Sequence, residues 1–306
     1  MTRAVVLAYH NVGARCLLAL LARGVEIPLL VTHHDNPAEN IWFDSVAEIA
    51  ARYDIPTIAP DDPNTAEIMA RIAAAQPDFL FSFYYRHMLK PGLLALAPRG
   101  AYNMHGSLLP KYRGRVPVNW AVLHGEHETG ATLHEMVARA DAGRIVAQSP
   151  VPILPDDTAF EVFNKVTVAA EIALAGALPG LLAGTAPHRA QDLAQGGYFG
   201  GRGPEDGRID WARPATSIHN LIRAVAPPYP GAFFDLRGER LVVTRSLCQP
   251  QRRAPSGGPG IYVDNARYYA DCGDGQVLRL LAIEHQGRPL EPADFAARFG
   301  GGKIAF

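Results

Sequence analysis

Cysteine is scarce in this sequence of 306 residues, and the three that occur, Cys16, Cys248 and Cys272, are odd in number and far apart. They form neither a disulfide framework nor the ligand spacing of a zinc site, which suits a reducing cytoplasm. An excess of charge is missing too, because 29 lysines and arginines stand against 30 acidic residues, for a net charge of −1. The surface as a whole therefore offers no field that would attract nucleic acid.

Other common signatures are absent as well. The apolar segment 4–8 is too short for the core of a signal peptide, and the longest apolar stretch, 166–183, contains Glu171 and Pro179. We therefore interpret 166–183 as a buried helix and expect a cytoplasmic protein. No His-Glu-x-x-His or Cys-x-x-Cys pattern occurs, so we expect no bound metal.

What is present in the first part of the chain is an alternation of apolar strands with helices. We predict strands at 3–9, 26–32, 55–58, 79–84 and 101–105, a loop at 10–13, and helices at 17–21, 44–53 and 64–75. This order predicts a parallel sheet with helices on both faces and right-handed crossovers. Ligands of such folds bind beyond the carboxyl ends of the strands.

The pattern changes after residue 117. We predict a helix at 117–124, strands at 129–137 and 144–153, and a helix at 158–183. The two strands should form a hairpin, because Asp141 and Gly143 between them are typical turn residues. Thr158 is in the position of an N-cap for the last helix.

The length of the chain predicts a second domain, because 306 residues exceed the usual size of one hydrophobic core. The glycine-rich stretch 196–204 lacks the Gly-Lys-Ser/Thr ending of a P-loop, so we predict a linker with no phosphate role. The predicted domains are 1–190 and 209–306, joined by a linker at 191–208. In the second domain a helix at 214–226 and five short strands are typical of a small β-barrel, the strands lying at 232–236, 240–247, 260–264, 267–272 and 276–284.

Asn103 and His105 are the strongest candidates for chemistry. They are two residues apart in a predicted strand, so their side chains share one face. An amide can stabilise a developing oxyanion, an imidazole can carry a proton, and Asp141 could hold that imidazole. Taken singly, a histidine among apolar residues is more often structural and Asp141 is more simply a turn residue, and sequence spacing leaves open whether the three meet.

Residues 103–110, Asn-Met-His-Gly-Ser-Leu-Leu-Pro, with Lys-Tyr-Arg-Gly-Arg at 111–115 and Asp141 downstream, resemble the signature of folate-dependent N-formyltransferases. This family includes transformylases for glycinamide ribonucleotide, for methionyl-tRNA and for nucleotide-linked amino sugars. The resemblance covers nearly the whole chain. It implies an α/β fold, with a Rossmann-like formyltransferase domain built on a mostly parallel sheet and a small C-terminal OB-like β-barrel.

Within this family the sequence most resembles the formyltransferases that act on UDP-4-amino-4-deoxy-L-arabinose in lipid A modification and polymyxin resistance. The resembling segments are 8–10, 32–37, 81–87, 139–143 and 223–233. The likeness implies transfer of a formyl group from 10-formyltetrahydrofolate to the sugar amine, with no metal and no covalent enzyme intermediate. Two departures affect this assignment: Gly201 and Gly203 replace an expected arginine and threonine, and the chain stops at Phe306, where the bifunctional enzymes continue into a dehydrogenase.

The resemblance also implies roles for individual residues. His105 would be the general acid and base, Asn103 the oxyanion stabiliser, and Asp141 the carboxylate that favours the protonated imidazole. The folate pocket would be lined by His87, Met88, Leu89, Arg115, Val137, Ala138, Arg139, Ala140 and Asp141. Candidate contacts to the sugar substrate are His10, Ser107, Tyr112 and Arg113.

Three other functions share these features. A methionyl-tRNA formyltransferase would resemble its relatives in carrying a basic insertion near residues 35–44, but this segment contains Asp35, Glu39 and Asp44 and no lysine or arginine. We therefore favour small-molecule partners over nucleic acid. A formyltetrahydrofolate hydrolase and a non-catalytic sugar-nucleotide-binding module are the remaining alternatives, and the sequence leaves open whether the chain forms a homo-oligomer.

Overall fold

The computed structural model describes residues 1–254 and 257–306 of the chain. Contacts between Cα atoms divide the chain into two compact units. The first consists of Met1–Pro117, Glu128–Pro152 and Phe163–Gly200, and the second of Val118–His127, Ile153–Val162 and Gly201–Phe306. Two short segments that precede residue 200 thus belong to the second unit, and the predicted linker 191–208 contributes residues to both units.

The first unit is built on a seven-stranded sheet in the order β3-β2-β1-β4-β5-β7-β8. Strands β1 to β5 are parallel and β7 and β8 are antiparallel, so the predicted Rossmann-like, mostly parallel sheet is confirmed. The strands are β1 (Arg3–Ala8), β2 (Glu26–Val31), β3 (Thr57–Ile58), β4 (Phe79–Phe83), β5 (Ala101–His105), β7 (Glu128–Glu135) and β8 (Ile145–Pro152). The central strand β4 is buried at every residue, as expected of a strand covered on both faces.

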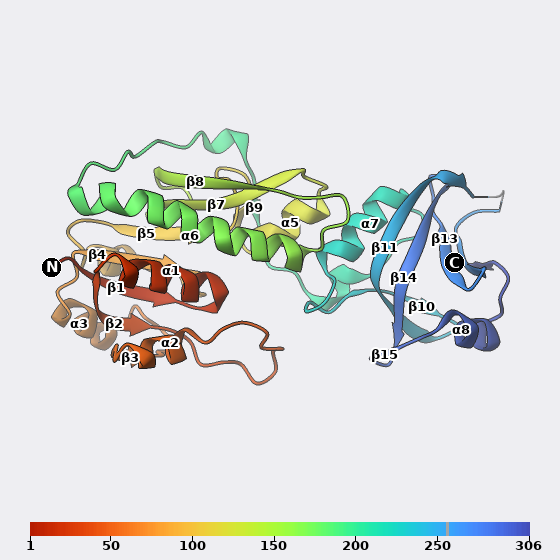
Figure 1. Ribbon diagram of the computed structural model, residues 1–306, viewed down its shortest axis with the longest axis horizontal. Coiled ribbons are helices and arrows are strands. Elements are labelled where there is room, and N and C mark those ends of the chain that lie inside the picture. The colour runs from red at the N-terminus through yellow and green to blue at the C-terminus, as the bar shows by residue number, and fades with distance from the viewer. Residues whose placement is uncertain (255–256) are drawn as a thin grey trace. The chain divides into compact units, whose positions relative to one another are not determined.

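Helices connect and cover these strands (Figure 1). They are α1 (His10–Ala22), α2 (Val46–Arg52), α3 (Ala66–Ala74), α4 (Pro91–Leu94) and most of α6 (Ala159–Ala183), whereas α5 (Pro117–Leu123) lies almost entirely in the second unit. The prediction of a loop at 10–13 is wrong, because α1 already begins at His10. Gly13 permits this early start, since a Cβ there would lie only 3.1 Å from the Cβ of Ala8 and 3.2 Å from Val46.

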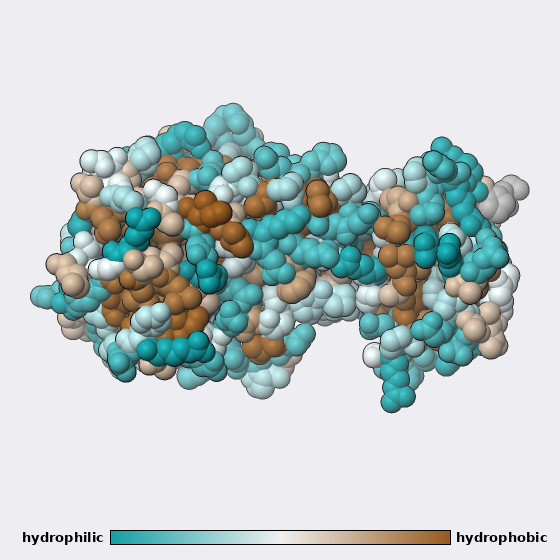
Figure 2. All heavy atoms as spheres, in the orientation of Figure 1, coloured by the Kyte–Doolittle hydropathy of each residue, from teal (hydrophilic) through white to brown (hydrophobic). Residues whose placement is uncertain are grey.

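Helix α6 is the most apolar helix of the chain. Among the described residues it is the one helix with the length and hydropathy to cross a membrane, but the core helix of a soluble protein passes the same test. Arg15 of α1 donates two hydrogen bonds to Glu171 of α6, and the two helices run side by side (Figure 1). Apolar side chains also reach the surface along α6 (Figure 2), where Val168 and Ile172 are exposed.

The second unit holds an antiparallel half-barrel sheet in the order β10-β11-β14-β13-β12-β16, with β15 paired to β14. Its strands are β10 (Ala232–Leu236), β11 (Glu239–Arg253), β12 (Gly260–Asp264), β13 (Arg267–Asp271), β14 (Gln276–His285), β15 (Arg288–Pro289) and β16 (Ile304–Ala305), and its helices are α7 (Ala215–Ala224) and α8 (Pro292–Phe299). The five predicted strands are therefore confirmed. Strand β11 runs six residues beyond its predicted end at residue 247, and its register against β14 shifts three times, which lets the long strand curve.

A short two-stranded sheet belongs to the first unit. Strand β6 (Arg113–Gly114) pairs in parallel with β9 (Tyr198–Phe199), after the turn η1 (Leu193–Gln195). Part of the stretch predicted as a linker is thus ordered against the loop that follows β5. A second short helix, η2 (Pro204–Gly207), lies in the second unit.

Candidate active site

Strand β5 brings Asn103 and His105 to one face of the sheet, as their spacing predicts. The residues opposite them in the antiparallel strand β7 are His134 and Thr132. His105 and His134 are both buried. Because β7 runs antiparallel to β5, its side chains reinforce the same face with a second pair of polar groups.

His105 is held by both of its ring nitrogens. Its Nε2 lies 2.7 Å from the carbonyl oxygen of Tyr112, which accepts the Nε2 hydrogen. Its Nδ1 lies 3.6 Å from Oδ1 of Asp141. Nδ1 is therefore the ring nitrogen at which this histidine can gain or lose a proton beside a carboxylate.

Asp141 lies between several donors. Its Oδ2 accepts a hydrogen bond of 2.8 Å from the backbone N–H of Gly114, and its Oδ1 faces both His105 and His134. Burial by itself would raise the pKa of Asp141, but the charge of His105, the hydrogen bond and charge of His134 and the Gly114 amide outweigh it, and the pKa falls well below its usual value. Asp141 is therefore ionised throughout the physiological range.

His134 joins Asn103 to Asp141, and sequence reasoning missed it. Its Nε2 lies 3.2 Å from the amide nitrogen of Asn103 and 3.5 Å from Oδ1 of Asp141. Its Nδ1 donates to the carbonyl of Glu135 at 2.7 Å, which fixes the ring. The four side chains of Asn103, His105, His134 and Asp141 form one connected polar group, which we call the β5–β7 site. The signal that could have found His134 is the period of two in the strand predicted at 129–137.

The loop after β5 shapes this site from one side. Ser107 is fully buried, and its hydroxyl donates to the carbonyl of Lys111 at 2.6 Å. Tyr112 accepts from His105 through its carbonyl, while its ring stacks on Phe199 at 5.1 Å. Arg113 is buried and donates through Nη2 to the carbonyls of Leu193 and Gly196. In this structure Ser107 and Arg113, two of the candidate sugar contacts, bond to the protein's own backbone.

The residues expected to line a folate pocket come from two segments and Arg115. Within the first segment, Met88 is 60 % exposed and Leu89 is buried. The rings of His87 and His33 lie 4.9 Å apart, and the carbonyl of Met88 accepts from Asn64. In the second segment Val137 is 42 % exposed, Ala138 and Arg139 are also exposed, and Ala140 and Asp141 are partly buried. Arg115 is exposed, and its backbone N–H donates to the carbonyl of Phe199.

His10, a candidate contact to the sugar, sits in a cluster of aromatic rings at the ends of β1 and β4. Its ring stacks on Phe43 at 4.0 Å and meets Trp42 and Phe163 edge to face, with Tyr84 6.2 Å away. We call these five residues the aromatic region. Burial lowers the pKa of His10 to about 3, with a smaller contribution from Arg86.

The neutral His10 has a defined tautomer. Its Nδ1 accepts a hydrogen bond of 3.0 Å from the backbone N–H of Asn11, so the ring hydrogen is on Nε2. His10 therefore presents its Nε2–H as a hydrogen-bond donor within the aromatic region. The aromatic region also contacts the loop after β5, because a Cβ on Gly106 would collide with the hydroxyl of Tyr84.

Backbone conformations that are uncommon outside glycine are found at both regions. His10 has φ = 68°, Tyr84 56°, Tyr112 54°, Val116 46° and Asp141 53°. Such conformations cost on the order of 1–3 kcal/mol each and tend to occur at functional sites. They support the β5–β7 site and the aromatic region as parts of the functional surface of the first unit.

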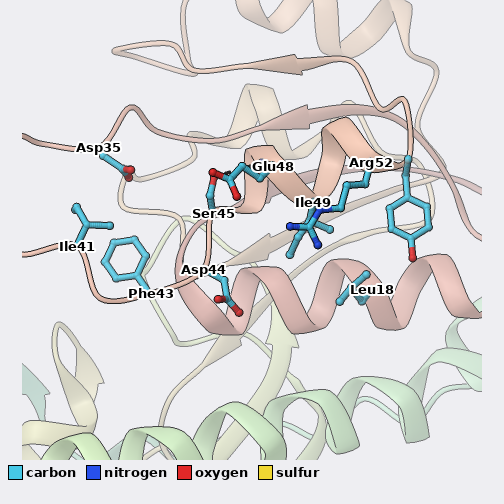
Figure 3. A pocket seen from close by; sticks show the side chains of 10 residues that line it. Leu18, Asp35, Ile41, Phe43, Asp44, Ser45, Glu48, Ile49 and Arg52 are labelled. Atoms are coloured by element: carbon cyan, nitrogen blue, oxygen red, sulfur yellow. Dashed lines mark hydrogen bonds between the residues drawn. The ribbon is translucent and has the colours of Figure 1, made fainter.

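A separate hollow of about 830 Å³ lies between α1, α2 and the segment 35–45 (Figure 3). Asp35, Asp44 and Glu48 line it together with Phe43, which also stacks on His10. Asp35 accepts the hydrogen of the Tyr9 hydroxyl at 2.7 Å. None of its ten lining residues belongs to the β5–β7 site, so the hollow and the candidate active site are distinct.

Two protein families match long stretches of the chain. The chain matches the family described as formyl transferase over residues 4–178, and the formyl transferase C-terminal domain over residues 203–300. The chain therefore belongs to the formyl transferase family, and it is an enzyme of that class. The β5–β7 site and most of the resembling segments fall within the matched ranges.

Solved structures share the fold over most of the chain. The N-formyltransferase from Helicobacter canadensis in complex with folinic acid and dTDP-3-aminofucose is similar with a TM-score of 0.71 and 19 % identity, covering 92 % of this chain and 99 % of that one. The sugar 3N-formyltransferase WlaRD, solved in the presence of dTDP and 5-N-formyl-THF, is similar with a TM-score of 0.72 and 18 % identity over 94 % and 99 %. HypX from Aquifex aeolicus in complex with tetrahydrofolic acid has a TM-score of 0.66 and 16 % identity over 99 % of this chain and 49 % of that one.

Proposed function

We propose that this enzyme transfers a formyl group from 10-formyltetrahydrofolate to the amine of a nucleotide-linked amino sugar, and that the sugar is UDP-4-amino-4-deoxy-L-arabinose. The observation that carries the proposal is the connected group of Asn103, His105 and Asp141. Two similar structures were solved with a folate and with dTDP or a dTDP-amino sugar, which supports this kind of substrate pair. The choice of the arabinose sugar rests on the five resembling segments.

The residues of the β5–β7 site have distinct roles in this proposal. Asn103 donates its amide hydrogen to the formyl oxygen as negative charge develops there. His105 exchanges a proton with the reacting nitrogen atoms at Nδ1, since its Nε2 is bound to the carbonyl of Tyr112. Asp141 stabilises the protonated imidazole from 3.6 Å away. No step requires a covalent bond to the enzyme.

The segments proposed for the folate suit an extended aromatic molecule. Met88 and Val137 are apolar and exposed, so a flat ring could cover them. Leu89 supplies a buried apolar contact beside Met88. Arg115 and Arg139 are exposed cations with the charge to bind the carboxylates of a folate tail.

The sugar is proposed to contact the aromatic region and the loop after β5. His10 offers its Nε2–H to a sugar oxygen, and Tyr112 bounds the site between His105 and Phe199. Ser107 and Arg113 contribute by holding the loop, given the backbone carbonyls to which they donate. We place the reaction in the cytoplasm on the basis of the three dispersed cysteines.

Methionyl-tRNA is the second candidate acceptor. The charge of the segment 35–44 argues against it, because its acidic side chains bind the protein itself: Asp35 accepts from Tyr9, and Glu39 pairs with Arg86 at 2.8 Å. A tRNA-binding segment would instead supply cations to the phosphates. We therefore propose no nucleic-acid partner.

A panel assay tests the function. The protein is incubated with 10-formyltetrahydrofolate and with UDP- or dTDP-linked amino sugars, or with methionyl-tRNA, and the products are identified by mass. We expect a formyl mass increment on the UDP-4-amino-arabinose compound with the largest kcat/KM. A larger kcat/KM with methionyl-tRNA, or release of formate without any acceptor, would overturn the proposal. Unchanged turnover after His105→Ala would overturn the catalytic role of His105, whereas ligand binding without turnover on any acceptor would favour a binding module.

A further inference from the structure

Gln191 reaches the β5–β7 site from a distant part of the sequence. It follows α6, in the stretch that links this helix to β9, and its side chain is partly buried. Its Nε2 donates to the carbonyl of Gly143 at 2.6 Å and to the carbonyl of Asp141 at 3.1 Å. The side-chain amide of Gln191 thus binds two backbone carbonyls of the turn that carries Asp141.

This turn has a conformation that needs support. Asp141 has φ = 53°, in a region that residues other than glycine rarely adopt. Two residues on, a Cβ at Gly143 would collide with the backbone carbonyl of Glu135, so the turn packs against the end of β7 without room to shift. The two hydrogen bonds from Gln191 offset part of the cost of this backbone conformation.

The stretch that contains Gln191 and β9 also positions Gly114, whose backbone N–H binds the carboxylate of Asp141. The carboxylate accepts from the N–H of Gly114, and β6, which contains Gly114, pairs with β9. Arg113 fixes that pairing through the carbonyls of Leu193 and Gly196. Residues 191–199 therefore position both the backbone and the carboxylate of Asp141, and we call them the brace.

We propose that Gln191 is a positioning residue for formyl transfer, which acts by holding Asp141 in place beside His105. The inference rests on the proposed function, because it assumes that Asp141 assists His105. Gln191 has no contact with the reacting atoms in this account. Its effect is on the placement of the carboxylate, where a displacement of about 1 Å can cost about 100-fold in rate.

The test replaces the amide and keeps its length. Gln191→Met removes the donor, and Gln191→Glu replaces it by a group that only accepts. We expect kcat to fall about 10- to 100-fold in both variants, with little change in KM for the sugar nucleotide. Gln191→His keeps one hydrogen-bond donor, so its kcat should lie between those of Gln191→Met and the wild type.

The pH dependence of kcat separates positioning from a general structural role. Burial raises the pKa of Asp141, while the charge of His105, the bond from His134 and the Gly114 amide keep it low. A displaced carboxylate loses these partners, so its pKa rises. The inflection on the acid side of the profile should therefore move to higher pH in Gln191→Met and return toward wild type in Gln191→His.

Gln195→Met is the matched control, because the side chain of Gln195 takes no part in the contacts of the brace with Asp141, Gly143 or Arg113 and donates to Asp192 in its own turn. It should keep the wild-type kcat and pH profile. Thermal melts establish that each variant folds; if Gln191→Met does not, Gln191→Glu and Gln191→His are judged by the same criteria. Wild-type kcat in a folded Gln191→Glu would overturn the inference.

Asp141→Asn keeps the two hypotheses apart. If Asp141→Asn retains full turnover, the proposed function of Asp141 fails, whatever Gln191 does. If Asp141→Asn is impaired and Gln191→Met is not, only the role of Gln191 fails. In the double variant Asp141→Asn with Gln191→Met, we expect kcat to be no lower than in Asp141→Asn alone. If Gln191→Met lowers kcat as much in the Asp141→Asn background as in the wild type, Gln191 does not act through Asp141.

Discussion

The β5–β7 site and the aromatic region each bury a histidine at the functional face of the first unit, and they give it opposite surroundings. His105 lies 3.6 Å from an ionised carboxylate. His10 lies among Phe43, Trp42 and Phe163, and burial lowers its pKa to about 3. Burial alone thus does not define a catalytic histidine, since the partners of the buried ring differ between the two regions.

This contrast assigns different tasks to the two regions. A ring beside a carboxylate can accept and return a proton, as formyl transfer to an amine requires. A neutral ring with a fixed Nε2–H can only present a hydrogen bond and an apolar face. We therefore propose that His105 carries the chemistry and that His10 contributes to recognition of the acceptor.

The largest expected effect tests the charged half of the comparison. Asp141→Asn keeps the shape of the side chain and removes its negative charge, so the protonated form of His105 loses its partner. We expect kcat to fall about 100- to 10,000-fold, with KM for the sugar nucleotide almost unchanged. Initial rates measured with saturating formyl donor give both constants. Asp61→Asn, an exposed aspartate in the same unit, is the control and should behave as wild type.

The amide of Asn103 should have the next largest effect. Asn103→Leu removes the donor proposed to bind the developing oxyanion while keeping a similar volume. We expect a loss of about 100- to 1,000-fold in kcat. A loss that appears only in KM would move Asn103 from transition-state stabilisation to substrate binding.

The neutral half of the comparison predicts a dependence of stability on pH. The pKa of His10 in the folded protein, about 3, lies below its ordinary value of 6.5. The unfolded state therefore takes up the proton first as the pH falls from 6.5, and the free energy of unfolding decreases by up to about 1.4 kcal/mol per pH unit from this residue. His33, whose pKa burial lowers to about 4, adds to the decrease in the same direction.

Asp141 acts in a different pH window. Its pKa is depressed, so its contribution to stability is present above pH 3.8 and is lost only as the pH falls below that value.

The contribution of His10 can be measured by urea unfolding between pH 7 and pH 5. Over this range the free energy of unfolding should decrease less in His10→Phe than in the wild type, whereas His34→Phe, at an exposed neighbouring histidine, should show the wild-type decrease. An unchanged slope in His10→Phe would mean that His10 is protonated in the folded protein.

Much of the fold could be predicted from the sequence because its signals are local. The apolar run 79–84 and the strand 101–105 gave the central strands, and Thr158 is the N-cap of α6, with its Oγ1 3.3 Å from the backbone nitrogen of Glu161. The start of α1 was not predicted, because it depends on how closely Gly13 packs against other segments. Helix α8 was also missed, at the end of the chain.

The candidate site could be predicted only in part. Asn103 and His105 could be identified from their spacing in one predicted strand. The contact of His134 with Asn103 could not, because it depends on the register of β7 against β5, which pairs the two residues. Gln191 is still less visible, since its partners Asp141 and Gly143 are 50 and 48 residues away. Which of these residues come into contact depends on how distant segments pair in the fold, and the sequence of each segment does not show that pairing.

The smallest expected effect concerns the surface contacts that hold the segment 35–44 near the aromatic region. Arg86 pairs with Glu39 at 2.8 Å and lies over the ring of Tyr9 at 4.7 Å, but Arg86 and Glu39 are about 40 % exposed. Exposed ion pairs contribute about 0.2–1 kcal/mol, and salt screens them. Arg86→Gln should therefore lower the free energy of unfolding by less than about 1 kcal/mol in urea titrations, and by less still at high salt. A loss of several kcal/mol would show that this pair, and not the packing of Phe43 on His10, is the main attachment of the segment.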